Sequence, residues 1–116
     1  MLVVDGENIV AIDVDQTLFM HGTAPQYEES FTIINPYSGS PIFGYKNWKH
    51  IELLKQYKGR GLKVIVWSSG GNLWAEAIVR KFDLVPYVDI VMNKPNKLID
   101  DLEPQDIFPC RIYLPE

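Results

Sequence analysis

The sequence feature that most constrains this chain is an apolar run that ends in two acids, the segment Ile9–Leu18 with the sequence IVAIDVDQTL. Residues two apart in a strand point to the same side, so Asp13, Asp15 and Thr17 are expected to leave the strand on nearly one side. Two carboxylates held together after a buried strand cost electrostatic free energy at neutral pH. The pattern therefore predicts a site that needs a cation, and a metal ion is the simplest candidate.

Length and composition narrow the class of protein. The 116 residues suit one small domain, and an apolar share of 47% supports a single core. A net charge of −4 provides no basic surface, so nonspecific nucleic-acid binding is not expected, although a nucleotide substrate stays possible. The single cysteine, Cys110, suits a reducing compartment and is expected to pack near the last strand. With no charged leader and no bilayer-spanning stretch, we expect a cytoplasmic protein without membrane contact.

Apolar runs and helical spacing alternate along most of the chain. Continuous apolar strands are typical of a parallel sheet covered on both faces. The alternation predicts an α/β domain, a three-layer Rossmann-like fold with a mainly parallel sheet of about five strands, formed by residues 1–116. The strands are expected at 9–14, 62–67, 88–92, 98–99 and 111–114, and the helices after the caps Asn47 and Asn72.

The segment at about 19–45 interrupts this alternation. Two β-prone runs, 31–34 and 42–45, flank a turn-rich stretch, which predicts a β-hairpin. Because the hairpin follows the acidic stretch directly, we expect a small flap over that site. Whether the flap gates a substrate or is a surface arm stays open.

Polar residues follow each predicted strand. In parallel sheets, ligands bind beyond the carboxyl ends of the strands, so these side chains are expected to share one crevice. They are Asp13, Asp15 and Thr17, then Ser68 and Ser69, then Lys94, and finally Asp100 and Asp101.

With these four groups in order, the chain resembles a phosphohydrolase of the haloacid dehalogenase (HAD) superfamily, of a minimal uncapped type. Asp13-Val14-Asp15-Gln16-Thr17 resembles the first motif of the superfamily, Ser68 the second, Lys94-Pro95 the third and Asp100-Asp101 the fourth. Gln16 departs from the pattern, because many relatives have glycine there. The resemblance implies an enzyme, a phosphoric monoester hydrolase that uses Mg²⁺.

Phosphoryl transfer assigns roles to these residues. Asp13 is placed to attack phosphorus and form an aspartyl-phosphate, and Asp15 to act as general acid and base. Thr17 is expected to hold Asp15 in place. Lys94 offsets the phosphoryl charge and is preferred over Lys97, because it directly ends its strand.

Phosphate and metal ligands complete the predicted site. Ser68 is preferred over Ser69 as the phosphate-binding side chain, aided by the backbone N–H groups of Ser69 and Gly70, and this choice stays open. Asp100 and Asp101 are expected to hold Mg²⁺ together with Asp13 and, by the resemblance, the backbone carbonyl of Asp15.

Several interpretations compete with or extend this prediction. The alternative function is a receiver-like signalling module that binds phosphate or a phospho-ligand without turnover. Without a large cap the site would be open, so the phosphorylated substrate could be a small molecule or the end of a macromolecule, with an oligomer closing the site. His21 is expected in an exposed loop and His50 on a helix surface, while Trp74 is expected near the site.

Overall fold

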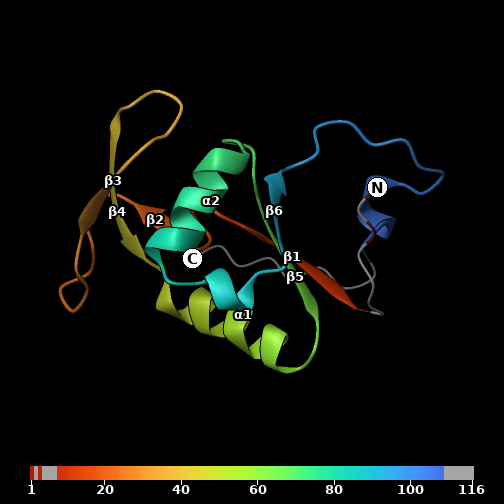
Figure 1. Ribbon diagram of the computed structural model, residues 1–116, viewed down its shortest axis with the longest axis horizontal. Coiled ribbons are helices and arrows are strands. Elements are labelled where there is room, and N and C mark those ends of the chain that lie inside the picture. Colours follow the sequence, from red (N-terminus) through yellow and green to blue (C-terminus); the bar gives the residue numbers. More distant parts are fainter. Residues whose placement is uncertain (2, 4–7, 109–116) are drawn as a thin grey trace.

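The computed structural model describes Met1, Val3 and residues 8–108. In this part of the chain, two three-stranded sheets and two α-helices form an α/β fold (Figure 1). The α/β class predicted from the sequence is confirmed. One sheet is parallel and the other is antiparallel.

The parallel sheet carries the candidate site at the carboxyl ends of its strands. Its strands are β1 (Ile9–Asp13), β5 (Lys63–Ser68) and β6 (Ile90–Asn93), in the order β1-β5-β6. In the register, Asp13 lies opposite Trp67, and Ser68 lies opposite Asn93. The carboxyl ends of the three strands therefore come together, as expected for a parallel sheet.

The antiparallel sheet is formed by the segment between β1 and the first helix. Its strands are β2 (Phe19–His21), β3 (Phe31–Ile34) and β4 (Pro41–Lys46), with β4 in the middle. The pairing of β3 with β4 confirms the predicted hairpin. The sequence analysis did not predict β2, because three residues are too few for a strand pattern to be recognised.

Two helices connect the strands of the parallel sheet. Helix α1 (Trp48–Gly59) begins at the predicted cap Asn47, whose side chain accepts the His50 N–H. Helix α2 (Asn72–Lys81) has Gly71 at its N-cap position, not Asn72 as predicted. Asn72 is the first residue of the helix, and its side chain accepts a hydrogen bond from the Tyr37 hydroxyl of the hairpin. Two short 3₁₀ helices follow, η1 (Val85–Tyr87) and η2 (Pro104–Asp106).

The core lies on one face of the parallel sheet. Along β5 the side chains alternate, with Val64, Val66 and Ser68 buried and Lys63, Ile65 and Trp67 half-buried. Both helices contribute to the same apolar cluster as Val64 and Val66, so both cover this face. Their buried residues in this cluster are Ile51, Leu54, Trp74, Ala75, Ile78 and Val79.

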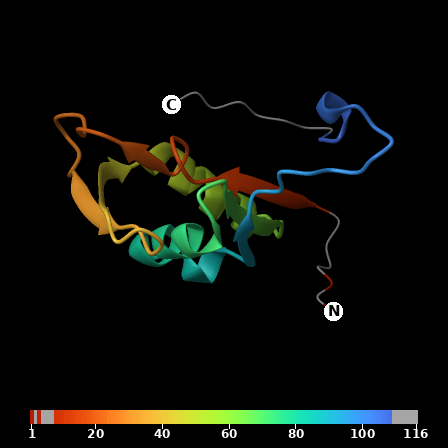
Figure 2. The same ribbon diagram turned by 90° about the horizontal axis from the view of Figure 1, so that it is seen from above.

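The far face of the sheet has no helical layer among the described residues. In Figure 2, α2 lies on one side of β1, and the segment that carries η2 lies on the other side. The described part of the chain therefore has the predicted α/β class, with helices on one face of the parallel sheet and not the predicted three layers.

The strand predicted at residues 98–99 is wrong. Leu98 and Ile99 form no strand and are 62% and 101% exposed. An apolar pair becomes a strand only where a neighbouring strand offers backbone hydrogen bonds, and no such pairing forms here. The strand predicted at 111–114 and Cys110 lie outside the described residues, so the sheet of about five strands has three in the described part.

The helices are short. Among the described residues, none is both long and apolar enough to cross a membrane.

Candidate active site

Asp13 lies at the end of β1 and has two polar partners. The Lys94 ammonium lies 3.2 Å from Asp13 Oδ1, and the Thr17 hydroxyl donates to Oδ2 at 3.3 Å. The side chains of Asp13 and Lys94 are 33% and 38% exposed, so both remain accessible to a ligand. Lys94, and not Lys97, is the lysine that the structure places on Asp13. Thr17 was expected to hold Asp15 but contacts Asp13 instead.

A tight turn after β1 brings Thr17 back to Asp13. The Val14 carbonyl accepts the N–H groups of Thr17, Leu18 and Phe19 at 3.2, 2.9 and 3.0 Å. Gln16 has a φ of 61°, a left-handed conformation that favours glycine. Its side chain accepts the His21 N–H at 3.2 Å. Gln16 thus adopts a backbone conformation that favours glycine, and its side-chain hydrogen bond lies within the same turn.

Asp15 has more hydrogen-bond donors than Asp13. The Trp74 indole N–H lies 3.2 Å from each carboxylate oxygen, and the Ser68 hydroxyl donates at 3.3 Å. His21 Nε2 lies 2.8 Å from Asp15 Oδ1. These contacts hold the carboxylate in one orientation, and the expected position of Trp74 near the site is confirmed.

His21 is a site residue that the sequence analysis underestimated. It is exposed, as expected, but it is the last residue of β2 and not a loop residue, and its ring packs edge-on against Phe19 at 4.9 Å between centroids. The available signal was the spacing of two between Phe19 and His21, which puts both side chains on the same face of a strand.

Ser68 links three segments of the site. Its side chain is fully buried and its oxygen accepts the Gly70 N–H at 2.9 Å. Its carbonyl accepts the Lys94 N–H at 2.9 Å, which fixes the backbone of Lys94 relative to the end of β5. Ser69 is exposed at the same turn. Ser68 therefore orients Asp15 and the turn, and the preference for Ser68 over Ser69 as phosphate ligand stays a prediction.

The hairpin contacts the start of α2. The Tyr37 hydroxyl accepts the Leu73 N–H at 2.9 Å and donates to Asn72 Oδ1 at 3.1 Å. The Asn72 N–H in turn donates to Asn93 Oδ1. A side chain at Gly71 would overlap the Tyr37 ring, so glycine is required for this close approach. The predicted flap thus lies against the turn that follows β5.

Asp100 and Asp101 do not join the other predicted site residues. Both are exposed, and Asp100 Oδ1 accepts the Leu102 N–H at 2.8 Å in a local turn. Within the described residues, no three or more His, Cys, Asp or Glu side chains are grouped to hold a metal ion. In Figure 1 the chain leaves β6 and runs away from α2. The four-acid metal site is therefore not formed, because residues 98–99 make no strand that would end at the shared edge.

The remaining acids, Asp13 and Asp15, still fit a sparsely ligated Mg²⁺. This ion commonly uses one or two carboxylates and keeps several waters, with substrate phosphate completing the coordination. The donor chemistry here, the Asp13 carboxylate, the Asp15 backbone carbonyl and a lysine, is thus compatible with Mg²⁺ and a phosphoryl group.

His50 corrects another expectation. It was expected on the surface of a helix, but it is 2% exposed, and its Nδ1 lies 2.6 Å from the Thr17 carbonyl oxygen. The sequence signal was its spacing of three after the cap Asn47, which points it back over the preceding turn.

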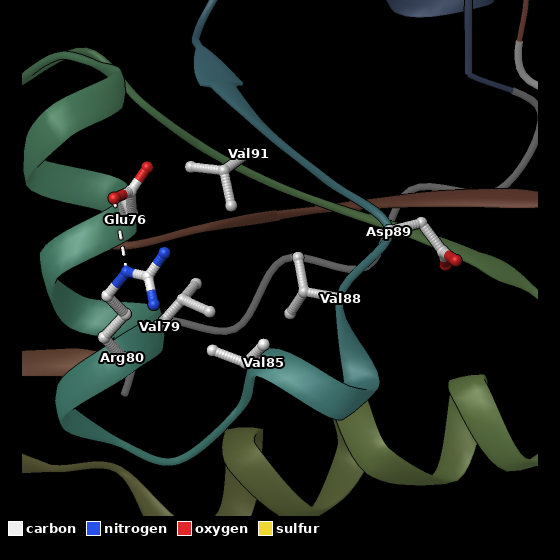
Figure 3. Close-up of a pocket in the computed structure, with 7 residues that line it drawn as sticks. All are labelled: Glu76, Val79, Arg80, Val85, Val88, Asp89 and Val91. Carbon is white, nitrogen blue, oxygen red and sulfur yellow. Dashed lines mark hydrogen bonds and ion pairs between the residues drawn. The ribbon is translucent and has the colours of Figure 1, made fainter.

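Two hollows among the described residues lie away from the candidate site. One, of about 130 Å³, is lined by valines of α2, η1 and β6, with Arg80 and Glu76 paired at 3.2 Å beside it (Figure 3). A second, of about 290 Å³, lies beside β2, β4 and the start of α1 and includes Met20, Tyr45 and Trp48. Neither is lined by a predicted site residue.

Comparisons with protein-family models, with curated proteins and with solved structures gave no match to this chain. The functional argument therefore depends on the residues of the site.

Proposed function

We propose that this chain is a Mg²⁺-dependent phosphatase that hydrolyses a phosphomonoester through an aspartyl-phosphate on Asp13. The observation that carries this proposal is the Asp13–Lys94 contact of 3.2 Å at the carboxyl ends of the parallel strands. A carboxylate beside a lysine at this position offers both a nucleophile and a positive charge for phosphoryl oxygens.

The reaction has two displacements. A carboxylate oxygen of Asp13 attacks phosphorus, and the bond from phosphorus to the leaving oxygen breaks while Asp15 gives that oxygen its proton. Water then attacks phosphorus, Asp15 takes a proton from the water, and the bond from Asp13 to phosphorus breaks. Inorganic phosphate and the free alcohol are the products, and both acids return to their starting states.

The neighbours of the two acids support these roles. Lys94 and Thr17 contact different oxygens of Asp13, which restricts how the carboxylate can turn. Trp74 and Ser68 donate to Asp15 and orient it relative to β1. Mg²⁺ held by Asp13 and Asp15 would supply further charge neutralisation on the phosphoryl oxygens.

An open site favours a substrate with an accessible phosphate. The side chains of Asp13 and Asp15 are 33% and 37% exposed, and the hairpin contacts α2 without covering them completely. The substrate class therefore includes a phosphorylated small molecule and the phosphorylated end of a macromolecule, and an oligomer could close the site.

The first test uses p-nitrophenyl phosphate. With Mg²⁺ the purified chain should release p-nitrophenol, and EDTA should stop the release. Asp13→Asn should abolish turnover, because an amide oxygen is a poor nucleophile. Asp83→Asn is the matched control, since Asp83 is an exposed acid at the end of α2 and should keep full activity. Substantial turnover by Asp13→Asn would sink the nucleophile assignment.

The second candidate function is a receiver-like module that binds phosphate without turnover. It would use the same carboxylate and lysine, because the Asp13–Lys94 contact of 3.2 Å suits phosphate binding whether or not a covalent step follows. The absence of turnover across a panel of phosphomonoesters, together with saturable binding of inorganic phosphate, would favour this function.

A further inference from the structure

We infer that His50 is a positioning residue that holds the turn after β1 (residues 14–19, here the acidic turn) in place. Through Thr17 of this turn, His50 orients the Asp13 carboxylate. The effect on catalysis rests on the proposed function, whereas the hydrogen bond that produces it does not. His50 contacts neither Asp13 nor Asp15, so its effect would pass through the backbone of the turn.

The proton on His50 is assigned by its surroundings. Nδ1 lies 2.6 Å from the Thr17 carbonyl oxygen, which can only accept, so Nδ1 must carry the proton. The Asn47 amide nitrogen also lies 3.1 Å from Nδ1, and it has Met20 Sδ at 3.7 Å as another acceptor. Nε2 is buried without a hydrogen-bond partner among the described residues. The imidazole therefore serves as a single donor aimed at one carbonyl.

A second bond from the same helix end reinforces the first. The Asn47 N–H donates to the Leu18 carbonyl at 3.0 Å, one residue beyond Thr17. The cap and the first turn of α1 thus hold two consecutive carbonyls of the acidic turn. Because Asn47 Oδ1 accepts the His50 N–H, the helix cap also fixes the backbone of His50.

The link to chemistry is the Thr17 side chain. Its hydroxyl donates to Asp13 Oδ2 at 3.3 Å, while Lys94 contacts Oδ1. A shift of the Thr17 backbone would move this donor away from Asp13 and free the carboxylate to rotate. An in-line attack tolerates little misplacement, and a displacement of about 1 Å can cost about 100-fold in rate.

Two substitutions separate the donor from the bulk of the side chain. Leu fills the buried space but leaves the Thr17 carbonyl without its donor. Asn places an amide nitrogen the same number of bonds from Cα as Nδ1, so it can restore the donor. His50→Leu should therefore impair positioning, and His50→Asn should rescue part of the loss.

The kinetic experiment compares these variants on p-nitrophenyl phosphate. His50→Leu should lower kcat by about 10-fold to 100-fold with KM within about 2-fold, and His50→Asn should recover at least about a third of the wild-type kcat. Ile51→Val is the control, because it trims the next buried residue of α1 and leaves the contact between His50 and the Thr17 carbonyl in place. An unchanged kcat in His50→Leu, or no recovery in His50→Asn, would overturn the inference.

A measurement that requires no catalytic activity tests whether His50 donates a hydrogen bond to the Thr17 carbonyl. Nitrogen-15 NMR of the histidine rings at pH 8 should show His50 protonated on Nδ1 and bare on Nε2, as the Thr17 contact requires. The Thr17 amide signal should move in His50→Leu and return toward its wild-type position in His50→Asn. The opposite tautomer, or an unmoved Thr17 signal, would overturn the inference even if the wild-type chain proves to have no phosphatase activity.

Discussion

At the scale of single residues, the site depends on how the Asp15 carboxylate is oriented. The Trp74 indole N–H reaches both of its oxygens at 3.2 Å, and the Trp74 side chain is almost completely buried. A buried donor keeps one geometry at little cost in entropy. Trp74 therefore serves the core and the site at once.

Trp74→Phe separates these two functions. Phenylalanine keeps an aromatic ring against Phe19, whose centroid lies 5.7 Å from that of Trp74, but it cannot donate to Asp15. We expect kcat to fall by about 10-fold, as for a misplaced general acid, and the free energy of unfolding to fall by about 1 kcal/mol. Steady-state kinetics and chemical denaturation check the two values. Trp48→Phe, which removes an exposed indole bonded to Glu28, is the control and should leave kcat unchanged.

Residue types alone predicted part of this arrangement. The acids after an apolar strand and the lysine after another predicted the Asp13–Lys94 contact, because parallel strand ends share an edge. His50 was misplaced, because its spacing from the cap Asn47 indicates the direction of the side chain but not the carbonyl that it contacts. That partner lies 33 residues earlier in the chain and becomes a neighbour only when the turn after β1 has formed.

At the scale of secondary structure, the carboxylate of Asp89, directly before β6, forms hydrogen bonds to both α1 and β5. Asp89 accepts two hydrogen bonds from Lys58 of α1, at 2.8 and 3.0 Å, and the Val64 N–H of β5 at 2.8 Å. The Lys58 hydrogen bond, followed by the Val64 N–H, lowers the pKa of Asp89 below its usual value. The ionised form is thus more favoured in the folded state than in the unfolded state.

This shift predicts how stability depends on pH. Because the folded pKa is the lower one, the stabilisation is fully present above the unfolded value of about 3.9 and is lost as the pH falls through the folded value. Asp89→Asn keeps an acceptor for Val64 but loses the charge. It should cost about 1 kcal/mol at pH 7 and make the decline in stability below about pH 4 shallower.

Urea denaturation from pH 7 to pH 3 measures both effects on Asp89→Asn. Glu76→Gln is the control, because it breaks the exposed pair with Arg80 and should alter the pH dependence little. Parallel stability curves for the wild type and Asp89→Asn would contradict the role of Asp89.

At the scale of the whole molecule, local patterns predicted the order of most elements but not their full assembly. The alternation of strand and helix signals predicted β1, α1, β5, α2 and β6 in order, because each pattern lies within one segment. The pair Leu98–Ile99 failed, since a strand of two residues depends on a partner distant in sequence. Without that strand, Asp100 and Asp101 do not reach the site.

The central claim is that Asp13, at the carboxyl end of β1, becomes phosphorylated. Asp15→Asn should slow hydrolysis of the aspartyl-phosphate, because the amide cannot take a proton from water. This variant is incubated with Mg²⁺ and a phosphomonoester that the wild type hydrolyses. Mass spectrometry should then find one added phosphoryl group on the peptide that contains Asp13. The Asp13→Asn, Asp15→Asn double variant should carry none. A phosphoryl group on another residue, or turnover by the wild type without any such adduct in Asp15→Asn, would contradict the account.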